Sequence, residues 1–186
     1  MATVIIRVPF VLLALASAAI AIPEAFEVGP ARLDDLPKGK EADGIAGDFV
    51  MRNDIVEVLI SGNLPERRAN MSTFYGADGM TPGCLYDLCL RGSRNDQITI
   101  FSPAGQRGPV SWVSIVSDGK SGTAEIETVT TPANNKGLFR RHVWRLKDGM
   151  SGIEVETTLR NESAAALKFT PEDKVTTLTQ NGQAGP

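Results

Sequence analysis

Short stretches in which apolar and polar residues alternate fill the chain from residue 47 onward, separated by glycine, proline and asparagine. That pattern is typical of β-strands joined by tight turns. No window between residues 47 and 160 repeats apolar residues at the i, i+3, i+4 spacing of an amphipathic helix. The pattern predicts an all-β domain, an antiparallel β-sandwich over residues 47–180. The expected strands are DFVMR (48–52), IVEVLI (55–60), CLYDLCL (84–90), QITIF (97–101), VSWVSIVS (110–117), TAEIETVT (123–130), LFRRHVWRL (138–146), IEVETTL (153–159) and one within KVTTLTQ (174–180).

Alternation also assigns the two faces of each strand, because successive side chains point to opposite sides. Ala124 and Ile126 are expected to face the core, with Glu125 and Glu127 in water. The expected strand 153–159 alternates in the same way, and Glu154 is the first residue of its solvent-facing side. One face of the predicted sheet is therefore dry and the other is solvated.

The stretch 110–117 differs, because it carries apolar residues on both faces. It predicts a strand that is covered on both sides or lies near a domain contact, with Trp112 as its anchor. The segments 117–122 and 147–152 each place Asp-Gly between two strand-like stretches. Asp-Gly tolerates the positive φ angles of tight turns, so both segments are expected to be hairpin turns.

The chain begins with a separate apolar segment, in which Arg7 precedes the unbroken stretch 8–22. This stretch is shorter than the roughly 20 residues that a membrane-spanning helix needs, and it has the size of a secretory signal core. Small residues end it, so cleavage after Ala21 is expected, with Ala18 as a second site and a buried N-terminal helix as the alternative interpretation. Residues 1–21 are therefore predicted to be a signal helix of a protein exported to the periplasm or outside the cell, with no stable membrane span after cleavage.

Two further segments lack a sustained period. Residues 22–46 combine proline, glycine and charge, which predicts a linker or capping loop without a core of its own. Residues 181–186 are expected to be a polar tail.

Charge and composition restrict the chemistry. The 19 basic and 22 acidic side chains give a net charge of −3, so no field is expected that would gather nucleic acid. One histidine and two cysteines cannot build a three-His or four-Cys zinc site. The strand glutamates lack the oxygen-rich loop of a calcium site. No metal and no cofactor is therefore expected.

The single histidine, His142, alternates with Arg140 and Trp144, so the three share one face of a strand. Histidine can act as a general base near neutral pH. The chain has no G-x-S-x-G nucleophile elbow beside it. A half-buried structural histidine is therefore the favoured interpretation, and a ligand-binding group of these three residues is the alternative.

Glu125 and Glu154 head the two closely spaced carboxylate pairs, which Glu127 and Glu156 complete. Residues i and i+2 of a strand lie about 6.7 Å apart, within the roughly 5 to 10 Å that glycoside hydrolysis uses. A solvated sheet face is the favoured explanation of the pairs, because outward glutamates opposite inward apolar residues are what such a face requires. The sequence thus offers no catalytic residue, and its candidate ligand-binding residues are His142, Arg140, Trp144, Glu125 and Glu154.

Cys84 and Cys89 lie on one predicted strand. Five strand residues separate their Cα atoms by about 16 Å and turn the side chains to opposite faces, whereas a disulfide needs Cα atoms within about 7 Å. Two unbridged thiols are expected unless a bulge breaks the strand.

The stretches GDFVMRNDIVEVLISGNLPERRANM, GCLYDLCLRG and IEVETTLRNES together resemble the N-terminal β-sandwich regions that precede PHP-type metal-dependent phosphoesterase domains in exported bacterial hydrolases. They are also loosely similar to the supersandwich domains of mutarotase-like carbohydrate-active proteins. The resemblance covers residues 47–163. A PHP domain needs several histidines, so the resemblance implies that this chain is an accessory part of a larger hydrolase.

These observations together predict an exported, non-catalytic accessory or binding module whose partner is a carbohydrate or a hydrolase domain. One alternative is a carbohydrate-active enzyme, mutarotase- or glycosidase-like, that works through strand glutamates with His142 nearby. The other is a self-associating envelope protein, which would expose an apolar patch or an unprotected edge strand.

Overall fold

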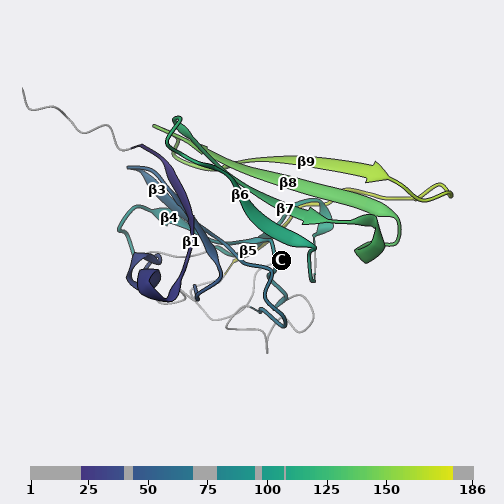
Figure 1. Ribbon diagram of the computed structural model, residues 1–186, viewed down its shortest axis with the longest axis horizontal. Coiled ribbons are helices and arrows are strands. Elements are labelled where there is room, and N and C mark those ends of the chain that lie inside the picture. The colour runs from purple at the N-terminus through teal and green to yellow at the C-terminus, as the bar shows by residue number, and fades with distance from the viewer. Residues whose placement is uncertain (1–21, 40–43, 69–78, 95–97, 107, 178–186) are drawn as a thin grey trace, which may run out of the picture.

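The computed structural model describes residues 22–39, 44–68, 79–94, 98–106 and 108–177. They form two antiparallel sheets, one with the strand order β1-β2-β3-β4-β5-β10 and one with the order β6-β7-β8-β9 (Figure 1). The predicted all-β, antiparallel character is confirmed. The first sheet comprises β1 (Glu24–Glu27), β2 (Phe49–Arg52), β3 (Val56–Ile60), β4 (Leu85–Leu90), β5 (Ile98–Ser102) and β10 (Lys174–Thr177), and the second β6 (Trp112–Asp118), β7 (Thr123–Thr130), β8 (Leu138–Lys147) and β9 (Glu154–Asn161).

Helical structure within the described ranges consists of short 3₁₀ turns: η1 (Pro30–Asp35), η3 (Pro103–Gly105) and η4 (Pro132–Asn134). None of the described helices has the length and apolar character needed to cross a membrane. The predicted signal helix of residues 1–21 and the predicted tail of residues 181–186 lie outside the described residues.

The facing sides of the two sheets share one apolar core, which makes the arrangement sandwich-like. Met51 and Val58 from the six-stranded sheet are fully buried against Ile126, Trp144 and Leu146 from the four-stranded sheet. Removing each such side chain from water stabilises the fold by about 1.5–3 kcal/mol. The predicted inward direction of Ala124 and Ile126 is confirmed, since both belong to this core.

The six-stranded sheet also buries its other face. Phe26, Val50, Leu59 and Tyr86 form a second cluster there, and Leu36 packs against it. Strands β2, β3 and β4 can do this because they carry apolar residues on both faces, as strands that are covered on both sides do.

Residues 22–39 and 44–46 contribute to this structure, which corrects the expectation of a loop without a core. Strand β1 pairs with β2, and Ala25, Phe26 and Val28 are buried. The guanidinium carbon of Arg32 lies 3.3 Å from the centre of the Phe26 ring. The alternation of apolar and polar residues in this segment is too short to predict a strand. Strand β1 forms because it pairs with β2, which the local sequence does not show.

Both predicted Asp-Gly hairpins are confirmed, since β6 pairs with β7 and β8 pairs with β9 across them. Gly119 in the first turn has a φ of +97°, and a Cβ atom there would lie 1.8 Å from the carbonyl oxygen of Pro23. Only glycine fits both the backbone angle and this close approach. The turn thereby brings the edge of the four-stranded sheet against the start of β1.

Strand β6 is an edge strand, and the prediction that it is covered on both sides and anchored by Trp112 is wrong. Trp112, Ile115 and Val116 are 42%, 37% and 48% exposed. The register shifts between Ile115 and Ser117, so a bulge takes Val116 out of the alternation. Apolar residues on both faces indicate two-sided burial for a central strand, but among the described strands β6 pairs with β7 alone.

Cys84 and Cys89 are both buried and not disulfide-bonded, as expected. The register of β3 and β4 shifts between Leu59 and Ile60, and the resulting bulge corrects the expectation of opposite faces. Cys84 belongs to the same cluster as Leu59, while the Sγ of Cys89 donates to Glu57 on the same side of β3 at 3.6 Å. Burial, followed by the charges of Asp87 and Glu57, raises the pKa of Cys89 to about 12.

Candidate functional site

The five residues singled out from the sequence separate onto the two faces of the four-stranded sheet. Arg140, His142 and Trp144 lie on the inner face of β8, and each is buried. Glu125 on β7 and Glu154 on β9 lie on the outer face. No site containing all five can form, because the sheet itself stands between the two groups.

His142 is completely buried, which corrects the expectation of a half-buried histidine. Its Nδ1 lies 2.9 Å from the Thr157 hydroxyl on β9. Burial, followed by the positive charge of Arg140, lowers the pKa of His142 to about 4. The imidazole is therefore neutral at pH 7 and shielded from any substrate in solution.

Trp144 is likewise part of the core. Its Nε1 donates to the Thr128 hydroxyl at 3.1 Å, and that hydroxyl donates to the Gly83 carbonyl at 3.0 Å. Phe101 packs edge-on against the indole, with 6.1 Å between ring centres. These contacts satisfy the indole and leave it no surface for a ligand.

The outer-face glutamates converge on Arg145. The register places Arg145 between Glu125 and Glu154, and its Nε donates to Glu125 at 2.5 Å while its Nη1 donates to Glu154 at 2.7 Å. Glu156 lies 3.7 Å from the same guanidinium. The hydrogen bond to Glu125 is the largest of the effects that raise the pKa of Arg145. The carboxylates therefore face a cation on a solvated sheet surface, where half of the Glu154 side chain is exposed.

A second outer-face group surrounds an aromatic side chain, and we name it the Trp112 patch: Trp112, Ser114, Glu127 and Arg141. Glu127 accepts a hydrogen bond from the Trp112 Nε1 at 2.9 Å, from the Ser114 hydroxyl at 3.1 Å and from the Arg141 Nε at 2.8 Å. Val129 stands opposite both Trp112 and Arg141 and is 1% exposed. The patch is thus an ordered surface that covers one apolar residue and leaves 42% of Trp112 in solvent.

Glu127 is held as an anion in this patch. Partial burial alone would raise its pKa, but the hydrogen bonds from Trp112, Arg141 and Ser114 outweigh burial and lower the pKa below its ordinary value. A carboxylate of this kind accepts hydrogen bonds at neutral pH and does not donate a proton.

Sequence reasoning missed this patch, although a signal for it exists. Trp112 and Ser114 are two residues apart and therefore share one face of their strand. The predicted hairpin at 117–122 aligns that side with the wet side of the next strand, which carries Glu127. Assigning Trp112 to the core hid that alignment.

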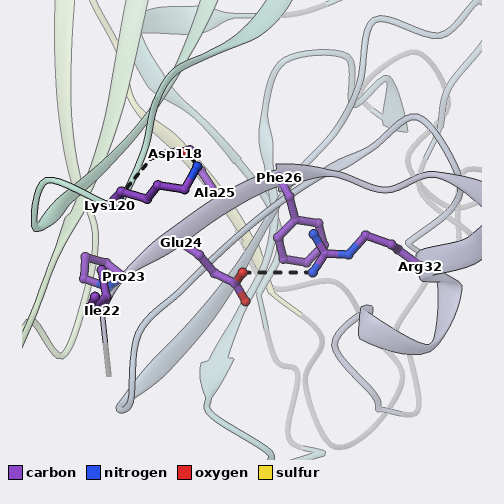
Figure 2. Close-up of a pocket in the computed structure, with 8 residues that line it drawn as sticks. All are labelled: Ile22, Pro23, Glu24, Ala25, Phe26, Arg32, Asp118 and Lys120. Atoms are coloured by element: carbon purple, nitrogen blue, oxygen red, sulfur yellow. Dashed lines mark hydrogen bonds and ion pairs between the residues drawn. The ribbon is translucent and has the colours of Figure 1, made fainter. Parts of the chain in front are cut away.

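A pocket of about 360 Å³ lies beside the start of β1 and the β6–β7 turn. Figure 2 shows the side chains that line it. Its charged side chains are paired with one another. Lys120 donates to Asp118 at 2.5 Å, and the Arg32 guanidinium lies 4.0 Å from Glu24. No charge of these lining residues is left to attract a ligand of opposite sign.

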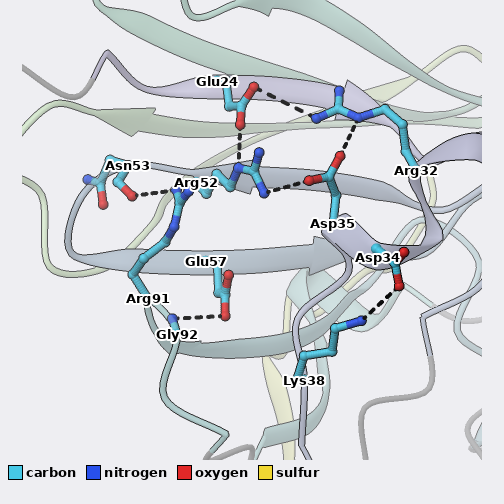
Figure 3. Close-up of polar contacts among 10 residues, drawn as sticks. All are labelled: Glu24, Arg32, Asp34, Asp35, Lys38, Arg52, Asn53, Glu57, Arg91 and Gly92. Carbon is cyan, nitrogen blue, oxygen red and sulfur yellow. Dashed lines mark hydrogen bonds and ion pairs between the residues drawn. The ribbon is translucent and has the colours of Figure 1, made fainter.

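The outer face of the six-stranded sheet carries a network of ion pairs, drawn in Figure 3. Arg52 pairs with Glu24 and with Asp35 at 3.5 Å, and the Arg32 Nε donates to Asp35 at 2.7 Å. The hydrogen bond from Arg32 is the main cause of the lowered pKa of Asp35. These ion pairs connect η1 to β1 and β2, so the network stabilises the fold.

In the part of the chain that the structure describes, no group of three or more His, Cys, Asp or Glu side chains is placed to hold a metal ion. Comparison of the chain with models of protein families, with characterised proteins and with solved structures gives no match. Among the described residues of the outer face, the Trp112 patch combines an exposed aromatic ring with polar side chains that are held by hydrogen bonds.

Proposed function

We propose that this chain is an exported, non-catalytic binding module that takes carbohydrate on the Trp112 patch. The observation that carries the proposal is the half-exposed indole of Trp112, held in place by the hydrogen bond from its Nε1 to Glu127. A large aromatic ring in solvent is informative, because it leaves apolar surface uncovered at a cost in free energy.

Carbohydrate is the ligand class that suits this surface. A sugar ring has an apolar face of C–H groups, which can pack on an indole, and hydroxyl groups around its edge that need donors and acceptors. Glu127 offers acceptor oxygens, Arg141 donors and Ser114 both. Because Glu127 already holds all three neighbours, little side-chain freedom would be lost when a ligand binds.

The other candidate residues support a non-catalytic role. His142 is buried and neutral, and Glu125 and Glu154 are bound to Arg145 on an open face. Neither group offers the pair of carboxyl groups flanking a bond that glycoside hydrolysis needs. In this proposal the module serves a hydrolase by holding it on its substrate, and catalysis belongs to another domain or chain.

Binding can be tested with the full chain and a panel of soluble polysaccharides: β-glucan, xylan, mannan and solubilised chitin. The panel is screened by affinity electrophoresis, and the dissociation constant for any polysaccharide that retards the protein is measured from the retardation at a series of polysaccharide concentrations, which does not depend on tryptophan fluorescence. We expect Trp112→Ala to weaken binding at least tenfold, or about 1.4 kcal/mol, and Trp112→Phe to keep part of the affinity.

Leu90→Ala is the matched control, because Leu90 is 62% exposed but lies on β4 of the other sheet. It should bind as the unmodified chain does. If no polysaccharide of the panel binds, or if Trp112→Ala and Leu90→Ala bind equally well, the carbohydrate proposal is wrong.

Export is tested separately by the N-terminal sequence of the protein recovered from the medium or periplasm. Cleavage after Ala21 would leave Ile22 as the first residue, one position before the buried Pro23 and two before β1. An intact Met1 in the recovered protein would contradict the proposed export signal.

A further inference from the structure

A second group of polar side chains lies inside the fold, between the sheets. We name it the Arg140 cluster: Gln106, Arg140 and His142. Gln106 follows η3, while the other two lie two residues apart on the inner face of β8. They are 1%, 7% and 0% exposed. Such burial is rare for arginine unless a partner compensates its charge.

The hydrogen bonds around Gln106 fix the direction of its amide. Its Oε1 accepts from the Arg140 Nη1 at 3.0 Å and from the Thr130 hydroxyl at 3.3 Å. Arginine can only donate, so the atom that faces it must be the amide oxygen. The amide Nε2 of Gln106 is then a donor, and it has no partner among the described residues.

Two more nitrogen atoms of the cluster are also without a partner among the described residues: the Nε of Arg140 and the Nε2 of His142. The Nε of arginine always carries a hydrogen. In the tautomer in which the Thr157 hydroxyl donates to Nδ1, the Nε2 of His142 carries one too. The cluster therefore presents up to three N–H donors and no acceptor to match them.

The charge of Arg140 also lacks a partner of opposite sign among the described residues. On the outer face of β8, Arg141 pairs with Glu127 and Arg145 with Glu125. Arg140 forms no ion pair with any described carboxylate. The Phe169 ring lies 5.7 Å from its Cζ, and Cys84 is a further neighbour. Asp173 affects the pKa of His142, but it accepts its hydrogen bond from the Ala104 backbone at 2.8 Å.

We infer that the Arg140 cluster is an internal binding site for a small oxyanion of the carboxylate class. Such a guest accepts hydrogen bonds and does not donate them, and a carboxylate has two oxygens for the N–H groups of Arg140, Gln106 and His142. Its charge would compensate the buried guanidinium. This site is distinct from the Trp112 patch, since the two lie on opposite faces of the four-stranded sheet.

The site can be observed directly by ¹H–¹⁵N NMR of the full chain, because the protein has one histidine. Sodium formate is the probe, and the ionic strength is held constant with sodium perchlorate, whose anion accepts hydrogen bonds weakly. We expect saturable shifts of the His142 Nε2 and Arg140 Nε–H signals, with the Arg141 Nε–H signal unchanged.

Arg140→Met should weaken formate binding at least tenfold, and Arg141→Met, its outer-face counterpart on the same strand, should not. If Arg140→Met does not fold, Gln106→Leu replaces it with the same expectation. The inference is overturned if the unmodified chain shows no saturable shift, as a site that holds only water would, or if the cluster variant binds formate as tightly as Arg141→Met. Neither result depends on carbohydrate binding.

Discussion

The two faces of the four-stranded sheet use the same residue types in opposite ways. Trp144 on the inner face is fully buried, whereas Trp112 on the outer face is 42% exposed. Arg140 on the inner face lacks a carboxylate partner among the described residues, whereas Arg145 on the outer face contacts three carboxylates. The buried side chains of the inner face therefore contribute most to the stability of the fold, and the outer face presents paired charges and an aromatic ring to solvent.

The largest difference should appear when the two tryptophans are exchanged for alanine. Trp144→Ala removes a fully buried side chain and its hydrogen bond to Thr128, so we expect a loss of about 3–5 kcal/mol in the free energy of unfolding. Trp112→Ala should cost no more than about 1 kcal/mol. Urea denaturation of both variants measures this, and equal losses would contradict the assignment of the two faces.

The next effect concerns pH and His142. The pKa of His142 is about 4 in the folded chain against 6.5 as its ordinary value. Between those values the unfolded chain binds a proton that the folded chain does not, so stability falls as pH is lowered from 6.5 to 4, by about 3 kcal/mol in total.

The matched control for this prediction is His142→Gln, which removes the only histidine. Its unfolding free energy should be less dependent on pH across the same window, because only the carboxylates then contribute. The two chains are compared by urea denaturation at intervals from pH 7 to 4. Parallel curves would show that His142 titrates normally and is not sealed in the core.

A smaller effect is expected for Arg145, although it has more charged partners than any other arginine on this sheet. Its side chain and those of its partners are between 21% and 60% exposed. Exposed ion pairs are worth about 0–1 kcal/mol, so Arg145→Met should lower the unfolding free energy by about 1 kcal/mol or less. A loss above about 3 kcal/mol would mean that the ion pairs of the outer face also contribute strongly to the stability of the fold.

The smallest effect should follow treatment with thiol reagents. Cys89 is 5% exposed, and its pKa is raised to about 12, so it holds almost no thiolate at pH 8. We expect neither cysteine to react with a disulfide reagent in the folded chain and both to react in 8 M urea. Rapid labelling of the folded chain would show that β4 opens under native conditions.

Local alternation was sufficient to predict most strands, both Asp-Gly hairpins and the faces of β7 and β9. Ala124, Glu125 and Glu127 lie where a period of two places them, because these strands are regular and one face is dry. The same rule placed Arg140, His142 and Trp144 together on one face of β8.

Non-local pairing explains what the alternation did not reveal. Strand β1 exists because β2 pairs with it and Arg52 binds Glu24, neither of which leaves a local period. Trp112 is exposed because β6 is an edge strand, and position in a sheet is not encoded in the strand itself. The depth of His142 likewise depends on the opposite sheet, which the local sequence cannot specify.

The central claim, that ligand binds on the outer face at Trp112, is tested most directly through the two indole N–H signals of the protein, one for each tryptophan. They are followed by ¹H–¹⁵N NMR while an oligosaccharide of the bound polysaccharide is added. We expect the Trp112 signal to shift in a saturable way with the Ser114 and Glu127 amides, and the Trp144 signal to stay in place. A shift of Trp144 without one of Trp112 would contradict the account.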